Sequence, residues 1–263
     1  MILDLFSLAG RVAVVTGAGR GIGAAIATAF ADVGADLVLG ARTEAQLDEV
    51  AAAVRARGRR AVVVAGSLAE RAGMQALVER AVAELGRIDV VVNNVGGSLP
   101  GPFLSTSEGA FDHAFRWNVT TAFNLTQLAV PVMLKSGGGC VLNIASAAGR
   151  FHERGFIAYG TAKAALCHFT QNLALDLAPR IRVNAIAPGA IETDALGIVL
   201  QNEELRRRMV AGTPLRRLGN VDDVAAAAVY LASPAGSYVT GRVIDVDGGI
   251  RRSNLEMGIP DVG

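Results

Sequence analysis

The sequence predicts an α/β fold in which a parallel sheet lies between two layers of helices. Short apolar runs alternate along the chain with longer segments in which apolar residues recur every three or four positions. The short runs are hydrophobic on both faces, as strands of a sheet covered by crossover helices must be. With 263 residues and 51% hydrophobic content, the chain fits a single domain spanning 1–263.

The first half of the chain contains four of the expected strands. They lie at residues 11–16, 36–41, 60–65 and 88–93. A helix is expected after each of the first three, because apolar side chains follow at helical spacing. Capping boxes formed by Thr43 with Gln46, and by Ser67 with Glu70, are expected to start the second and third helices.

The second half continues the alternation. Helices are expected at 107–135, 156–178 and 221–231, and strands at 140–145, 181–187 and 243–246. Segment 191–212 is expected to form one or two helices of a lid, whereas no element is expected at 254–263.

The loop at 96–102 is rich in glycine and proline and follows a strand end, where open α/β sheets bind ligands. We therefore expect it to border the active site.

Composition argues against several classes of protein. A net charge of +1 and scattered aromatic residues predict no nucleic-acid partner. Cys140, Cys167, His113, His152 and His168 lack metal-ligand spacing, so no metal site is expected, and the two thiols are expected to be free and buried. The sequence has no apolar run of membrane-spanning length and no signal-peptide pattern, so we expect a cytoplasmic protein without a membrane partner.

A glycine-rich turn follows the first expected strand. Residues 16–23 read TGAGRGIG and lie between a strand and a helix. Backbone N–H groups and the positive end of the helix dipole can bind a pyrophosphate at such a place. This context predicts a dinucleotide site, although the spacing from Gly17 to Gly21 is one residue longer than in the common G-x-G-x-x-G fingerprint.

Residues 146–163 contain a hydroxyl, a phenol and an ammonium group, on Ser146, Tyr159 and Lys163. Tyr159 and Lys163 are four residues apart in a helix-forming segment, so they share one helix face, and the ammonium can favour the ionised phenol. A phenol whose pKa lies near neutrality is a usable general acid or base. The stretch therefore predicts proton-transfer chemistry.

Together these residues resemble the short-chain dehydrogenase/reductase family, in its single-domain subgroup, which includes 3-oxoacyl-ACP reductases. The resemblance covers about residues 8 to 249. It rests on ordered matches at Thr16 to Gly23, Asn93 to Gly96, Asn118, Ser146, Tyr159, Lys163, Pro188, Gly189, Ile191, Thr193 and Gly241 to Gly249. It implies a Rossmann-like, doubly wound sheet of seven parallel strands in the order 3-2-1-4-5-6-7, within three α/β/α layers. The implied reaction is hydride transfer between a nicotinamide and a carbonyl or secondary alcohol.

The resemblance implies catalytic roles for four residues. Tyr159 would protonate the carbonyl oxygen during reduction, while Ser146 would hold that oxygen by a hydrogen bond. Lys163 would bind the nicotinamide ribose and, with the oxidised cofactor, lower the phenol pKa. Asn118 would support a water-linked proton path to the lysine, and as a polar residue within a helix it would also kink that helix.

The resemblance also implies a set of cofactor-binding residues. They are Gly17, Arg20, Gly21, Ile22, Gly23, Arg42, Ser67, Leu68, Asn94, Gly96, Tyr159, Lys163, Pro188, Gly189, Ile191 and Thr193. Ser67 stands where the family usually has an aspartate that contacts the adenine. The cofactor is expected to be NADP, with NAD possible, because the second strand ends in Gly-Ala-Arg without the carboxylate that favours an NAD ribose. Arg20 and Arg42 would bind the 2′-phosphate, and Glu44 is better explained by the helix dipole.

The expected substrate is a partly apolar, small-molecule carbonyl or alcohol compound. The candidate walls of its pocket are residues 97–99, 147–151, 156, 190 and 191, together with the apolar residues of the expected lid, Leu196, Ile198, Val199 and Leu200. A 3-oxoacyl thioester carried by ACP or CoA is the alternative, suggested by segment 189–194 and by Arg180 and Arg206. An inactive nucleotide-sensing protein is a third possibility, against which the intact catalytic set argues. A homotetramer is expected because the helix after Tyr159 is apolar nearly all round, and the resemblance implies pairing through this helix.

Overall fold

Seven parallel strands form one sheet in the computed structural model, which describes residues 1–197, 201–255, 259 and 261. The strands are β1 (Val12–Thr16), β2 (Asp36–Ala41), β3 (Ala61–Ala65), β4 (Val90–Asn93), β5 (Gly139–Ile144), β6 (Ile181–Pro188) and β7 (Val243–Val246). Their order is β3-β2-β1-β4-β5-β6-β7, and neighbouring strands run parallel. This is the Rossmann-like, doubly wound sheet that the resemblance implies.

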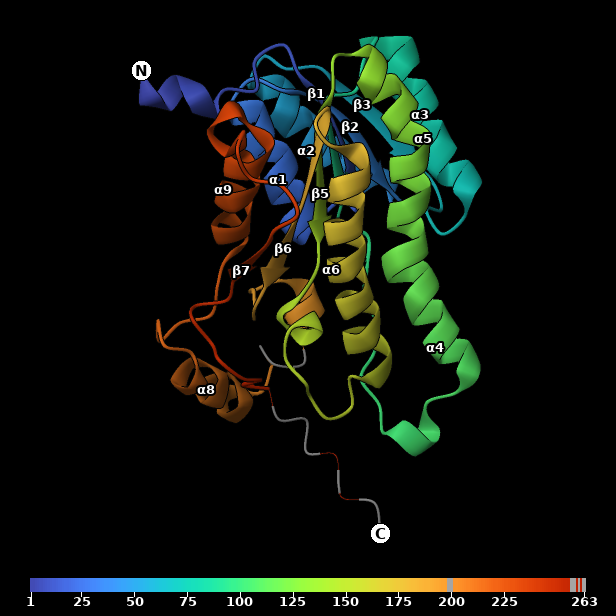
Figure 1. The fold of residues 1–263 in the computed structure, drawn as a ribbon. Helices are drawn as coiled ribbons and strands as arrows, with labels where there is room; N and C mark the ends of the chain where they lie inside the picture. The colour runs from blue at the N-terminus through green and yellow to red at the C-terminus, as the bar shows by residue number, and fades with distance from the viewer. Residues whose placement is uncertain (198–200, 256–258, 260, 262–263) are drawn as a thin grey trace.

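Helices cover both faces of the sheet (Figure 1). The α-helices are α1 (Gly21–Asp32), α2 (Glu44–Ala56), α3 (Arg71–Leu85), α4 (Glu108–Phe115), α5 (Thr121–Lys135), α6 (Ile157–Leu177), α8 (Glu203–Gly212) and α9 (Val221–Ala232). Short 3₁₀ helices lie at Ile2–Phe6, Phe103–Ser105, Ala147–Gly149, Asp194–Leu196 and Pro234–Gly236. Buried side chains of α1, α2 and α9 form one core against the sheet. Those of α3 and α5, with the C-terminal part of α6, form the other.

The strand order reverses at β1, and this topological switch point positions the candidate site. Val14 of β1 pairs with Val38 of β2 on one side and with Val91 of β4 on the other. From β1 the chain builds first one half of the sheet and then the other, so the connections after β1 and β4 leave the carboxyl edge in opposite directions. A crevice opens between them, where doubly wound folds bind ligands. Figure 1 places α8 beyond this edge.

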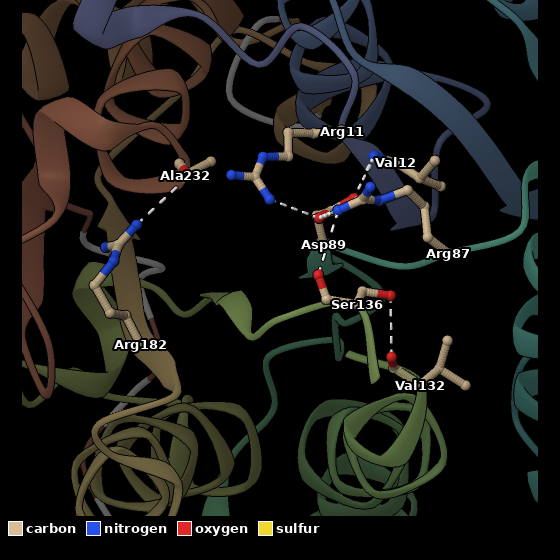
Figure 2. Close-up of polar contacts among 8 residues, drawn as sticks. All are labelled: Arg11, Val12, Arg87, Asp89, Val132, Ser136, Arg182 and Ala232. Atoms are coloured by element: carbon tan, nitrogen blue, oxygen red, sulfur yellow. Dashed lines mark hydrogen bonds and ion pairs between the residues drawn. The ribbon is translucent and has the colours of Figure 1, made fainter. Parts of the chain in front are cut away.

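The opposite edge of the sheet is held by a buried carboxylate, that of Asp89 (Figure 2). Asp89 is 2% exposed and accepts hydrogen bonds from Arg11 at 2.9 Å and from two nitrogens of Arg87 at 2.7 and 2.8 Å. Its second oxygen also accepts from the backbone N–H of Val12 at 2.9 Å. A buried carboxylate needs hydrogen-bond partners, and these bonds supply them. They also connect the start of β1 to the start of β4.

The structure corrects several expectations about local structure. Thr43 and Glu70 are the N-cap residues of α2 and α3, and neither side chain caps its helix. The Ser67 hydroxyl instead accepts from the N–H of Ala69 at 3.4 Å, so α3 begins later than the capping-box pattern indicates. In segment 191–212 the structure has a 3₁₀ turn and α8, while residues 198–200 lie outside the described part. The two cysteines are free and buried, as expected.

Candidate active site

One cavity of about 880 Å³ opens at the carboxyl edge of the sheet. It joins the glycine-rich turn after β1 to the segment around Tyr159. Most of the predicted site residues line it: Gly17, Arg20, Gly21, Ile22, Arg42, Leu68, Asn94, Gly96, Ser146, Tyr159, Lys163, Pro188, Gly189, Ile191 and Thr193. Gly23, Ser67 and Asn118 do not line it. The sheet thus brings the glycine-rich turn and the predicted proton-transfer residues to one space.

The glycine-rich turn has the shape needed to hold a pyrophosphate. Gly17 and Gly21 have φ angles of +63° and +56°, which side-chain-bearing residues rarely adopt. A Cβ on Gly23 would lie 2.2 Å from the carbonyl oxygen of Gly17, so Gly23 lets α1 pack close to the turn rather than facing the cavity. The Asn94 amide donates to the carbonyls of Thr16 and Gly17 at 3.0 and 3.2 Å. The turn therefore has a fixed backbone at the start of α1, which fits a dinucleotide.

The three proton-transfer residues come from the end of β5 and the start of α6. Ser146 follows β5 in extended conformation, and its hydroxyl accepts from the N–H of Ala148 at 3.2 Å. The spacing on α6 brings the Lys163 ammonium to 5.8 Å from the centre of the Tyr159 ring. Lys163 is buried, and its ammonium donates to the carbonyl of Ile144 at 2.7 Å. The predicted grouping of these side chains is present in the structure.

Burial governs the ionisation of this group. Burial raises the pKa of the Tyr159 phenol, and its hydrogen bond with Ser146 opposes that shift. Burial also lowers the pKa of Lys163 to about 8, against a smaller opposing effect of the Cys167 thiol. The expectation that Lys163, together with the oxidised cofactor, lowers the phenol pKa stays a prediction. The phenol stays protonated at neutral pH, which is the form that a general acid requires.

Asn118 lies in a π-helix, Arg116–Thr120, between α4 and α5. Its side-chain nitrogen donates to the carbonyls of Ala114 at 2.8 Å and Gly97 at 3.1 Å, and its oxygen accepts from the Gly97 N–H at 2.9 Å. The expected helix distortion is thus observed. A Cβ on Gly96 would lie 2.6 Å from the Asn118 oxygen and 2.8 Å from the Lys163 nitrogen. Asn118 therefore holds the loop after β4 beside the lysine.

Comparison with known proteins identifies the family. A family model described as "Enoyl-(Acyl carrier protein) reductase" matches residues 17–251. The chain belongs to the short-chain dehydrogenase/reductase family. An uncharacterized oxidoreductase of Mycobacterium tuberculosis is 57% identical over 263 residues, covering 100% of both chains.

Two solved structures extend this likeness to complexes. A 7α-hydroxysteroid dehydrogenase complexed with NADH and 7-oxo glycochenodeoxycholic acid has a TM-score of 0.92 and 39% identity, covering 95% of this chain and 98% of that one. A gluconate 5-dehydrogenase from Burkholderia cenocepacia in complex with NADP and tartrate has a TM-score of 0.90 and 32% identity, covering 95% and 98%. This short-chain dehydrogenase/reductase is an NAD(P)-dependent enzyme acting on alcohol or carbonyl groups.

The two arginines of this short-chain dehydrogenase/reductase differ in their surroundings. Arg20 forms an ion pair with Asp194 at 3.1 Å, a partner 174 positions away that the sequence did not reveal. Arg42 lines the cavity, is exposed, and has no hydrogen-bond or ion-pair partner among the described residues. Glu44, the possible competing acid, does not line the cavity. Of the two candidates for a 2′-phosphate contact, Arg42 is the one whose charge is not already matched.

The substrate end of the cavity contains both expected and unexpected residues. Expected wall residues that line it are Gly97, Ser98, Leu99, Ala147, Ala148, Phe151, Phe156, Ala190 and Ile191. Lining residues that no sequence pattern indicates are the sole tryptophan, Trp117, as well as Glu153, Met209 and the segment Ser253 to Leu255. Asn254 donates to the Met209 carbonyl at 3.2 Å, which holds this segment against α8. No periodicity in the sequence places such a segment.

Within the described residues, no group of three or more His, Cys, Asp or Glu side chains could hold a metal ion. None of the helices in those same residues combines the length and apolar character needed to cross a membrane.

Proposed function

We propose that this enzyme transfers a hydride between NADP(H) and a partly apolar ketone or secondary alcohol, using Ser146, Tyr159, Lys163 and Asn118. The observation that supports this most directly is the single cavity lined by both the pyrophosphate-binding turn and the Tyr159 phenol. The apolar walls beyond Tyr159, including Phe151 and Phe156, favour a substrate with hydrocarbon character.

Each catalytic residue has a distinct task in reduction. The bound nicotinamide supplies the hydride to the carbonyl carbon. Ser146 donates a hydrogen bond to the carbonyl oxygen and so fixes its position beside Tyr159. Tyr159 gives its phenolic proton to that oxygen as negative charge develops there. Lys163, whose lowered pKa eases proton exchange, binds the ribose and helps to restore the phenolic proton.

Asn118 acts mainly by position in this proposal. Its amide oxygen and the Lys163 ammonium both lie beside Gly96, where the absent Cβ leaves them room. Two hydrogen bonds of the Asn118 side chain, with the N–H and the carbonyl of Gly97, fix the loop after β4, and the third binds the Ala114 carbonyl in α4. This loop forms the floor of the cavity next to the lysine. We also propose a water-linked proton path to Lys163 that Asn118 supports through its side-chain oxygen.

The preference for NADP rests on Arg42. Its guanidinium is exposed at the end of β2, where a 2′-phosphate would lie, and the cavity lining at that end contains Ala41, Thr43 and Gln46 but no carboxylate. A charge-assisted hydrogen bond of about 1.5–3 kcal/mol corresponds to roughly a 10- to 100-fold preference. Solvent screening of an exposed arginine favours the lower end. Arg20 contributes less than the sequence suggested, because Asp194 already pairs with it.

We also propose a homotetramer assembled through α5 and α6. Leu175 on α6 is 79% exposed and Phe123 on α5 is 43% exposed, and the Phe123 ring meets that of Phe169 edge-on at 6.4 Å between centroids. Apolar side chains on adjacent helices form a surface suited to a second copy. A single domain spanning 1–263 and a cytoplasmic location stay predictions from the sequence.

The 3-oxoacyl thioester alternative loses one of its supports. Arg180 directly precedes β6 and so lies at the amino edge of the sheet, away from the cavity. Arg206 pairs with Glu192 at 3.0 Å. Arg180 is therefore too far from the mouth of the cavity to bind a carrier phosphate, and Arg206 could do so only by breaking its ion pair with Glu192.

A panel of ketones and 3-oxoacyl thioesters, assayed by loss of reduced-cofactor absorbance, tests the function. We expect ketone reduction, and we expect Tyr159→Phe to lower kcat by at least about 100-fold with little change in cofactor affinity, since a general acid is lost. Near-normal turnover by Tyr159→Phe would overturn the mechanism. Reduction of thioesters alone would favour the alternative substrate.

A further inference from the structure

The loop between β5 and α6 places a carboxyl group, that of Glu153, in the wall of the same cavity as Tyr159. Phe156 connects the two residues. Its backbone N–H donates to the Glu153 carbonyl at 3.3 Å, and its ring meets the Tyr159 ring at 6.1 Å between centroids. Tyr159, Phe156 and Glu153 thus belong to one wall of the cavity.

The Glu153 carboxyl has an unused hydrogen-bonding atom. One of its oxygens is buried and has no hydrogen-bond partner among the described residues. Burial raises the pKa of this carboxyl to about 7, and a hydrogen bond with Ser253 opposes that shift. A buried polar atom without a partner costs free energy, so an oxygen of this kind in a cavity wall is suited to a ligand donor.

The cations near Glu153 in sequence are occupied elsewhere. Arg154 pairs with Asp261 at 2.7 Å and donates to the Ile259 carbonyl at 3.0 Å, while Arg150 pairs with Asp245 at 3.3 Å. No described cation therefore neutralises the Glu153 carboxyl.

The other acids of the cavity lining differ from Glu153 in this respect. Glu192 pairs with Arg206 at 3.0 Å, and Asp194 pairs with Arg20 at 3.1 Å. Among the described lining residues, Glu153 is thus the one acid without an ion-pair partner. Its carboxyl gives this part of the cavity lining an acidic character.

We propose that Glu153 determines substrate specificity by accepting a hydrogen bond from a hydroxyl group of the substrate, at the end distant from the reacting carbonyl. The same carboxyl disfavours substrates with an anionic group at that end, because two carboxylates repel each other strongly where solvent is excluded. This inference rests on the proposed reduction of ketones and adds a substrate class to it, namely neutral hydroxyketones and the corresponding diols.

Three matched ketones test the proposal: hexan-2-one, 6-hydroxyhexan-2-one and 5-oxohexanoate, which end in a methyl, a hydroxyl and a carboxylate group. Binding is measured by the fluorescence of Trp117, the single tryptophan, which lines the cavity. Titrations with and without NADP give Kd independently of turnover. Reduction of each ketone with NADPH gives kcat/KM for the same set.

We expect the wild-type enzyme to bind the hydroxyketone at least about 10-fold more tightly than the oxo acid, as expected for one charge-assisted hydrogen bond. Glu153→Gln should reduce that ratio to about 3-fold or less, by weakening the hydrogen bond to the hydroxyketone and by removing the repulsion of the oxo acid. Glu192→Gln, a matched change at an acid already paired with Arg206, should leave the ratio unchanged.

A second variant separates recognition from anchoring of the C-terminal segment. If Glu153 served only to hold Ser253, then Ser253→Ala would alter the ratio as Glu153→Gln does, and the proposal would be overturned. Equal binding of the hydroxyketone and the oxo acid by the wild type, or binding of none of the three, would also overturn it. Selective binding without reduction of any ketone would instead refute the proposed function and leave the assignment of Glu153 standing.

Discussion

Gly96→Ala tests whether Asn118 and Lys163 form one fixed unit. A Cβ on Gly96 would approach the Asn118 oxygen to 2.6 Å and the Lys163 nitrogen to 2.8 Å, both closer than van der Waals contact allows. Neither group can move freely, because Asn118 makes three hydrogen bonds and Lys163 is bonded to the Ile144 carbonyl. Overpacking of this kind lowers the free energy of unfolding by about 1–3 kcal/mol. Replacing glycine also reduces the backbone freedom of the unfolded chain, which raises the free energy of unfolding by about 0.4–1 kcal/mol.

We therefore expect Gly96→Ala to lower the free energy of unfolding by about 1–2 kcal/mol and kcat by roughly 10- to 100-fold, as for a small misplacement of catalytic groups. Gly101→Ala is the control, because a Cβ there meets nothing within 4 Å in the same loop. Urea denaturation gives the stability, and ketone reduction at saturating cofactor gives kcat. If Gly96→Ala weakened only cofactor binding, or matched Gly101→Ala in kcat, the coupling between Asn118 and Lys163 would be refuted.

The remaining predictions concern the cofactor, the buried lysine and the amino edge of the sheet. Ala41→Asp combined with Arg42→Ile should shift the ratio of kcat/KM values from NADPH toward NADH by at least about 10-fold, and an unchanged ratio would exclude Arg42 as the selective residue. Lys163→Met should bind cofactor more weakly. The pKa of Lys163 is lowered from 10.5 to about 8 in the folded state, so between these pH values the unfolded chain binds more protons at this site than the folded protein. The free energy of unfolding of the wild type should therefore rise relative to that of Lys163→Met from pH 8 toward 10.5. A stability difference between the two proteins that stays constant across that range in urea denaturation would contradict the lowered pKa. Asp89→Asn should lower the free energy of unfolding by about 2 kcal/mol and Tm by about 4–8 °C, because it breaks a buried ion-pair network. Asp32→Asn, at an exposed ion pair, is the control and should leave Tm unchanged. Equal Tm values for the two variants would show that the buried network does not stabilise the fold.

The order of the strands and the grouping of the catalytic residues could be predicted because both depend on short-range patterns and on the family resemblance. The strands at 36–41 and 243–246 have the expected bounds, since turn-forming residues flank apolar runs at both places. Ser146, Tyr159 and Lys163 come together because a strand end and one helix turn place them. Patterns of this kind are local, and the fold preserves them.

One failure is local: Thr43 matches a capping pattern, but in the structure its hydroxyl does not reach the helix N–H groups. The other failures involve partners that are distant in the sequence. The pairing of Arg20 with Asp194 joins the turn after β1 to the segment after β6, and Ser253 forms a hydrogen bond with Glu153. Such contacts depend on how loops are packed, which the spacing of residues along the chain does not encode.

The Asp89 network has a consequence for engineering this enzyme. In many proteins the residues that could be changed for stability also touch the substrate, so gains in one property reduce the other. Here the ion-paired aspartate between Arg11 and Arg87 lies at one edge of the sheet (Figure 2), and the cavity lies at the opposite edge. Mutant libraries aimed at heat tolerance can be directed to the amino edge while libraries aimed at new ketones are directed to the carboxyl edge. Because the effects of distant substitutions on stability are nearly additive, the best variants from the two libraries can be combined in one chain.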